Sequence, residues 1–210
     1  MIKDTYKTIT NTSEGLFTDK GSKFIAYAFP IKSEDDIKEY LEFVKKEHWK
    51  ARHHCYAWRL GTDRNTYRSN DDGEPSGTAG KPILGQLDSF EITDTLVIVV
   101  RYFGGTKLGV GGLINAYKSA TIDALNQTEI EERTIDNYYK IVYDYGITSQ
   151  VMNFINHHQL NIINQSFGEK AMMHFSIPIS KADGILEILE EKSLNEGFTD
   201  LFELELTVTK

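Results

Sequence analysis

The sequence predicts a protein of mixed α/β and α+β class with two domains, the second of them a ferredoxin-like βαββαβ sandwich. The chain has 210 residues, and at roughly 150 residues per domain this length favours two domains. Apolar residues make up 40% of the chain, which is ordinary for folded domains. Strand and helix patterns restart after a charged run, EIEER, at 129–133. We therefore expect one domain over residues 1–132 and another over residues 133–210.

The first half contains strand patterns rich in β-branched and aromatic residues and helix patterns with apolar residues at helical spacing. Ser33 precedes three acidic residues and is expected to be a helix N-cap. Residues 95–103, TLVIVVRYF, are apolar without alternation, which predicts a central strand covered on both faces. Ala116, Ala120 and Ala124 recur one turn apart and permit close packing of their helix. The expected strands are 6–10, 23–31, 53–60, 66–69 and 95–103, and the expected helices are 34–48, 83–89 and 113–128.

The second half has the element order βαββαβ within 77 residues, which is the ferredoxin-like arrangement. Thr148 or Ser149 is expected to cap its first helix, which carries Val151, Phe154 and Ile155. The expected strands are 135–145, 161–166, 171–178 and 201–209, and the second helix is expected at 183–192.

Composition excludes several classes of protein. The longest aliphatic run is Leu96 to Val100, whereas a membrane-spanning helix needs about 20 residues. The first ten residues do not resemble a signal peptide. A single cysteine, Cys55, cannot form an internal disulfide and fits a reducing cytosol. We therefore expect a soluble cytoplasmic protein with no membrane partner.

The net charge of −8 argues against a protein that coats nucleic acid along its whole surface, and we expect no DNA partner. The charge is unevenly distributed. Residues 1–133 contain 18 basic and 20 acidic residues, whereas residues 134–210 contain 5 and 11. An anion-binding surface should therefore lie in the first half.

The first candidate site is the loop DDGEPSGTAGKP at 71–82. Asp71, Asp72 and Glu74 could hold Mg²⁺ or act as an acid and base pair. The spacing does not fit a calcium loop, and prolines occupy two required positions of a Walker A loop. A rigid structural turn and a ligand-contacting loop are the other interpretations.

The second candidate is RYFGGTKLGVGGL at 101–113, where a buried strand, a glycine-rich loop and a helix N-terminus follow one another. Free N–H groups and the helix dipole favour an anion at such a place. The dinucleotide-binding fingerprint is incomplete because its third glycine would fall at Ile114. Arg101, Lys107 and Lys118 add positive charge. Packing of loop against loop is the alternative, and Arg101 could instead pair with a carboxylate such as Asp71 or Asp72.

The third candidate is Arg52-His53-His54-Cys55. Successive strand residues point to opposite faces, so His54 and Cys55 cannot form a catalytic pair. His53 and Cys55 share a face, but a zinc site would need further ligands. We interpret Cys55 as a small buried apolar residue.

These three motifs, in this order and at these separations, closely resemble the Impact family, and within it the bacterial members of the YigZ type. The resemblance covers the whole chain. It implies a first domain like domain 2 of ribosomal protein S5, followed by a ferredoxin-like domain, a pairing similar to the last two domains of elongation factor G. The eukaryotic relatives regulate translation through protein partners and carry an additional N-terminal domain. We do not expect such a domain before Thr10 in this chain.

Our leading hypothesis is a cytoplasmic accessory protein without catalytic activity or cofactor that binds RNA or the ribosome and takes part in translation regulation. No nucleophile and base are recognisably paired in the sequence. The alternatives are an enzyme that uses a metal at Asp71, Asp72 and Glu74 on a phosphorylated or nucleotide substrate, and a protein-interaction module. The expected RNA-binding or anion-binding face consists of Arg101, Gly104, Gly105, Lys107, Gly109, Gly111, Gly112, Lys118 and Lys81.

Overall fold

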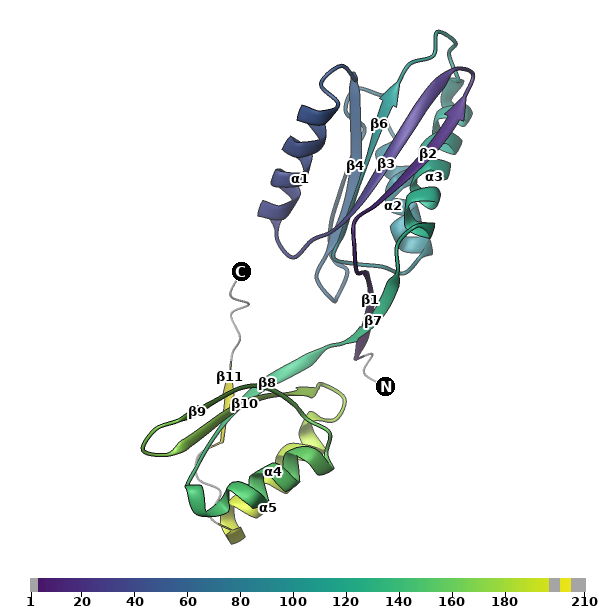
Figure 1. The fold of residues 1–210 in the computed structure, drawn as a ribbon. Coiled ribbons are helices and arrows are strands. Elements are labelled where there is room, and N and C mark those ends of the chain that lie inside the picture. Colours follow the sequence, from purple (N-terminus) through teal and green to yellow (C-terminus); the bar gives the residue numbers. More distant parts are fainter. Residues whose placement is uncertain (1–3, 197–200, 205–210) are drawn as a thin grey trace. The chain divides into compact units, whose positions relative to one another are not determined.

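The computed structural model describes residues 4–196 and 201–204. Its contacts divide the chain into two units (Figure 1). Residues 6–133 form the first unit, and Asp4 and Thr5 join the residues from Thr134 onwards in the second. The change of unit between Arg133 and Thr134 lies beside the boundary expected from the sequence. We propose that these units are two separate folding domains.

Five strands of the first unit form one antiparallel sheet in the order β2-β3-β6-β4-β5. The central strand, β6, is buried at every position from Thr95 to Arg101, which confirms the interpretation of its apolar run. The strands are β2 (Ser13–Asp19), β3 (Ser22–Pro30), β4 (His53–Leu60), β5 (Thr66–Asn70) and β6 (Thr95–Tyr102).

Helices cover both faces of this sheet (Figure 1). On one face, α2 (Gly80–Ser89) and α3 (Gly109–Asn126) pack on Phe24, Cys55 and Val99. On the other face, α1 (Glu34–Glu47) packs on the alternate residues of the same strands. Ser33 caps α1 with a complete capping box, as predicted.

Two strands of the first unit, β7 (Ile130–Thr134) and β2, were not predicted. β7 contains most of the charged run EIEER and pairs with β1 (Thr5–Ile9), which was predicted. β2 was also missed, because its polar residues and Gly15 weaken the strand pattern. A Cβ atom at Gly15 would lie 2.2 Å from the backbone nitrogen of Ala124. The alanine stripe of α3 therefore packs directly on β2, which is the close approach that its small residues permit.

Helices α2 and α3 begin three and four residues earlier than predicted, at Gly80 and Gly109. Glycines and Pro82 made both segments look like loops. The first turn of a helix tolerates such residues, because its N–H groups have no partner within the helix. Gly109, Gly111 and Gly112 therefore belong to the helix itself and not to the loop before it.

The second unit has the ferredoxin-like arrangement that the sequence predicts. Its antiparallel sheet has the order β11-β8-β10-β9, and α4 and α5 share one core with it. Neither Thr148 nor Ser149 caps α4. Ile147 is the N-cap residue, and Thr148 Oγ1 donates to the carbonyl of Tyr145, the first residue of a short 3₁₀ helix. The elements are β8 (Asp136–Tyr143), η1 (Tyr145–Ile147), α4 (Thr148–His157), β9 (Asn161–Phe167), β10 (Ala171–Pro178), α5 (Ala182–Glu196) and β11 (Leu201–Leu204).

The last predicted strand, 201–209, is described only through Leu204, and the rest of it lies outside the described residues. Among the helices that the structure describes, none is long and apolar enough to cross a bilayer.

Candidate anion-binding site

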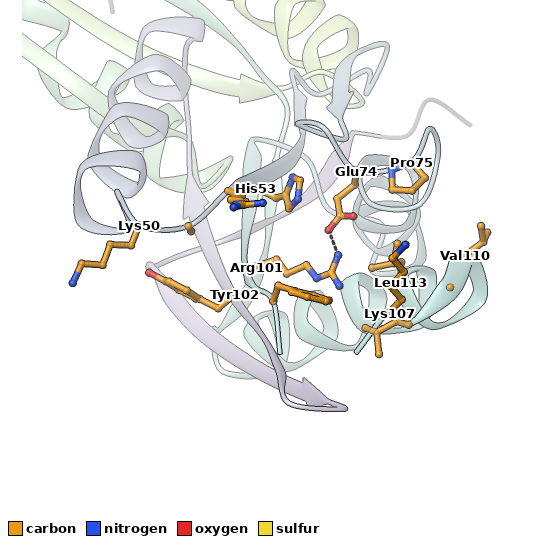
Figure 2. A pocket seen from close by; sticks show the side chains of 14 residues that line it. Lys50, His53, Glu74, Pro75, Arg101, Tyr102, Lys107, Val110 and Leu113 are labelled. Atoms are coloured by element: carbon orange, nitrogen blue, oxygen red, sulfur yellow. Dashed lines mark hydrogen bonds and ion pairs between the residues drawn. The ribbon is translucent and has the colours of Figure 1, made fainter. Parts of the chain in front are cut away.

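A pocket of about 920 Å³ lies in the first unit where β4 begins, β6 ends and α3 begins. Of the described residues that line it, four are basic, Lys50, Arg52, Arg101 and Lys107, and one is a carboxylate, Glu74. In Figure 2 the Arg101–Glu74 pair lies between Lys50 and Lys107. The pocket therefore carries a surplus of positive charge in a chain whose net charge is −8.

Arg101 and Glu74 form a buried ion pair. The Nη1 atom of Arg101 donates to Oε1 of Glu74 over 2.6 Å, and their side chains are only 8% and 3% exposed. The hydroxyl of Tyr117 on α3 donates to the same oxygen over 2.8 Å. Burial raises the pKa of the Tyr117 phenol, so this hydroxyl keeps its proton. Arg101 thus pairs with a carboxylate, but with Glu74 and not with Asp71 or Asp72.

Cys55 lies next to Tyr117 and is fully buried. Its Sγ atom is 3.0 Å from the carbonyl oxygen of Asp71 and 3.3 Å from the hydroxyl of Tyr117. Burial raises the pKa of the thiol, and the nearby Glu74 adds to the effect. Because the thiolate is the reactive form, this environment suits a structural cysteine, as interpreted from the sequence.

Asp71 stabilises the start of α2. Its carboxylate accepts N–H bonds from Gly77, Ala79 and Gly80 over 2.8–2.9 Å. Partial burial raises the pKa of the carboxyl, but these three bonds outweigh burial, and the pKa lies below its ordinary value. Asp71 therefore acts as a cap from outside the helix, next to the positive end of the helix dipole.

The other two acids of the DDGEPSGTAGKP loop also have separate structural contacts. Asp72 accepts the backbone N–H of His54 over 2.6 Å, and Glu74 holds Arg101. Among the described residues, no three metal-binding side chains form a group that could hold an ion. Each of the three carboxylates of this loop is thus engaged by a different donor of the chain.

The N-terminus of α3 opens into the pocket. Gly109 and Val110 line it, and no side chain of the described residues caps the helix. The first four N–H groups of a helix have no partner within it and favour an anion. Gly111 faces open space, because a Cβ atom there would meet no atom within 4 Å. A ligand can therefore approach the backbone closely.

The glycines of the loop before α3 and the first residue of the helix, Gly109, have structural causes. A Cβ atom at Gly104 would lie 1.9 Å from the carbonyl carbon of Gly21, so this position admits only glycine. Gly105 and Gly109 have φ values of +89° and +74°, which side chains rarely adopt. The alternative of loop packing against loop therefore explains Gly104, but it does not explain Gly111.

The Nε atom of Arg101 is buried without a hydrogen-bond partner among the described residues. The guanidinium lies 5.4 Å from the ring centre of Phe24 and 5.6 Å from that of Phe103. Buried N–H groups are nearly always paired. Because this atom is enclosed within the protein, the exposed cations of the pocket, and not Nε of Arg101, are the groups that a ligand can reach.

The structure brings together only part of the predicted face. Arg101, Lys107 and Gly109 line the pocket, whereas Lys81 and Lys118 are exposed on α2 and α3 outside its lining. Sequence reasoning missed Lys50 and Arg52 as members of the site. Their membership depends on the pairing of β4 with β6, which places His53 opposite Arg101. The residues just before His53 therefore lie at the pocket.

The fold and this site define the class: a two-unit protein in which a ferredoxin-like unit follows an α/β unit with a basic pocket at a helix N-terminus. The family model described as the Impact N-terminal domain matches residues 20–125. The IMPACT family member YvyE of Bacillus subtilis is 33% identical over 96% of this chain and 92% of its own length. The IMPACT family member YigZ of Escherichia coli is 34% identical over 77% of this chain and 80% of its own length. The chain belongs to the IMPACT family.

Among solved structures, the crystal structure of a hypothetical protein is similar over 98% of this chain and 100% of its own, with a TM-score of 0.69 and 29% identity. This likeness covers both units. The family resemblance that the sequence predicted is confirmed.

Proposed function

We propose that this protein is a non-catalytic accessory protein that binds RNA, free or within the ribosome, at the pocket over the N-terminus of α3. The observation that carries the proposal is the uncapped helix N-terminus within a lining of four basic side chains and one carboxylate. Backbone N–H groups and basic side chains are the groups that bind phosphates in proteins.

The charge of the pocket supports this assignment. Glu74 is already neutralised by Arg101, so Lys50, Arg52 and Lys107 leave a surplus of positive charge at the surface. All three of these residues are exposed. Since the whole chain is acidic, the attraction for phosphate is local to this face and not a property of the whole protein.

The buried groups oppose a catalytic function. The Cys55 thiol is held in its protonated form, and the carboxylates of Asp71, Asp72 and Glu74 are each occupied by separate donors. A catalytic nucleophile needs a base within hydrogen-bond reach. The contacts of the thiol and of the three carboxylates hold the protein structure together and do not form such a pair.

The cellular process is taken from the family resemblance. It implies translation regulation in the cytoplasm, which fits RNA as the ligand. The yeast IMPACT homolog is 35% identical over 47% of this chain but only 39% of its own length. The protein partners that the resemblance implies for eukaryotic relatives therefore do not transfer directly. Binding experiments should therefore test protein partners as well as RNA.

The dependence of RNA affinity on salt tests this proposal. The double variant Arg52→Ala/Lys107→Ala removes two exposed charges from the pocket. If both charges meet phosphates, the slope of log affinity against log salt should flatten by about 1.4, at roughly 0.7 per contact for single strands. The control is Lys32→Ala/Lys38→Ala, which removes two exposed charges near the opposite end of the sheet. An unchanged slope in the pocket variant would contradict the proposal.

A further inference from the structure

We propose that the pocket selects single-stranded RNA, whose unpaired bases stack on the exposed rings of Phe103 and Trp49. This inference rests on the proposed function and names the form of RNA that the same site accepts.

The first observation is the exposure of two aromatic rings beside the basic side chains. Phe103 lines the pocket and is 58% exposed, and Trp49 is 73% exposed. Trp49 directly precedes the lining residues Lys50, Ala51 and Arg52. Exposed rings close to basic side chains can offer their faces to the bases of a nucleic acid whose backbone those side chains bind.

The second observation is that a buried structure supports the Phe103 ring. The guanidinium of Arg101 lies 5.6 Å from its centre. Glu74 accepts a hydrogen bond from that guanidinium, and Tyr117 donates a hydrogen bond to Glu74. Arg101, whose side chain is buried, therefore lies against the Phe103 ring from the protein side. A ring held from one side keeps its exposed surface ready for a planar ligand.

The third observation is the alternation of ring and charge along the chain. Trp49 is followed by Lys50 and Arg52, and Phe103 is followed by Lys107 and the N-terminus of α3. Proteins that bind single strands combine aromatic platforms for bases with cations for the backbone. Bases within a duplex are already stacked and paired, so they cannot offer their faces to such rings.

The experiment measures fluorescence anisotropy of a labelled RNA of about 12 nucleotides, a length within the range that single-strand sites cover. The RNA is used alone and annealed to its complement, with the full chain as the protein. The variants are Phe103→Leu and Trp49→Leu, which keep an apolar side chain and remove the ring. The matched control is Phe167→Leu on β9, a ring that is 65% exposed in the second unit.

We expect the wild type to prefer the single strand at least tenfold. Phe103→Leu should weaken single-strand binding roughly 5- to 150-fold, the loss associated with one stacked base, and should leave the salt slope unchanged. Single-stranded RNA should also quench the fluorescence of Trp49, and Trp49→Leu should remove that quenching because Trp58 is buried. Phe167→Leu should bind as the wild type does.

Two results would overturn the inference. Equal or tighter binding of the duplex would contradict stacking while leaving RNA binding intact, and so would ring variants whose affinity stays within twofold of the Phe167→Leu control. Failure of the wild type to bind either RNA would instead remove the proposed function together with this inference.

Discussion

Replacing Arg101 by methionine should lower the free energy of unfolding of the first unit by about 3–5 kcal/mol, the cost of leaving one charge of a buried pair alone. Glu74 is 3% exposed and would keep only the hydroxyl of Tyr117 as a described partner. Methionine retains much of the aliphatic stem of arginine, so little of the loss comes from packing.

The double variant Arg101→Met/Glu74→Gln should recover most of this loss. Glutamine still accepts the hydrogen bond from Tyr117, and no charge remains buried. Replacing a buried ion pair by a neutral pair of similar volume is often close to neutral in stability. The double-mutant cycle should therefore give a coupling free energy of about 2–3 kcal/mol between the two positions.

Urea denaturation followed by tryptophan fluorescence measures these changes, because both tryptophans, Trp49 and Trp58, lie in the first unit. The control is Lys7→Met, which removes a surface pair with Glu91 whose side chains are 41% and 57% exposed. It should cost less than about 1 kcal/mol. The reasoning is refuted if Arg101→Met costs no more than Lys7→Met, or if the effects of the two substitutions simply add.

Three further predictions concern single residues. Gly111→Ala should raise the free energy of unfolding by up to about 1 kcal/mol, because alanine favours the helix and its Cβ atom would meet no atom there. In RNA titrations the same substitution should weaken binding, whereas the control Gly184→Ala, at the same position of α5, should leave binding unchanged. Asp71→Asn should cost about 1–2 kcal/mol at neutral pH. Because the pKa of Asp71 in the folded protein lies below the unfolded value of 3.8, its contribution to the free energy of unfolding is present above that value and is lost as the pH falls through the folded pKa. In acid denaturation, the stability difference between wild type and Asp71→Asn should therefore shrink below about pH 4. Finally, burial raises the pKa of Cys55, so a thiol reagent should label it only after urea unfolds the protein; rapid labelling of the native chain would restore the thiol-site alternative.

Apolar periodicity predicted most of the fold. The run from Leu96 to Val100 identified the central strand, and Ser33 identified the start of α1. Strands β2 and β7 were not predicted because they are rich in polar residues and bury few apolar side chains. Hydrogen bonds of their backbone hold them in place. Such strands depend on a partner distant in the sequence, and local patterns do not contain that partner.

The candidate site was only partly predictable, for the same reason. The glycine loop and Lys107 were visible as a local motif, whereas the membership of Lys50 and Arg52 depends on the pairing of β4 with β6. The partner of Arg101 was predicted as a class, a carboxylate. Its identity as Glu74 depends on the turn at Asp72 and Gly73, both of which have positive φ.

The central claim is that phosphate binds at the N-terminus of α3, and an NMR titration of the full chain with single-stranded RNA tests it most directly. The amide signals of Gly109, Val110 and Gly111 report on N–H groups in the first turn of α3 that have no partner within the helix. We predict that these signals shift together and reach saturation at one RNA concentration. Shifts confined to residues beyond 134, or amides of α3 that do not respond, would contradict the account.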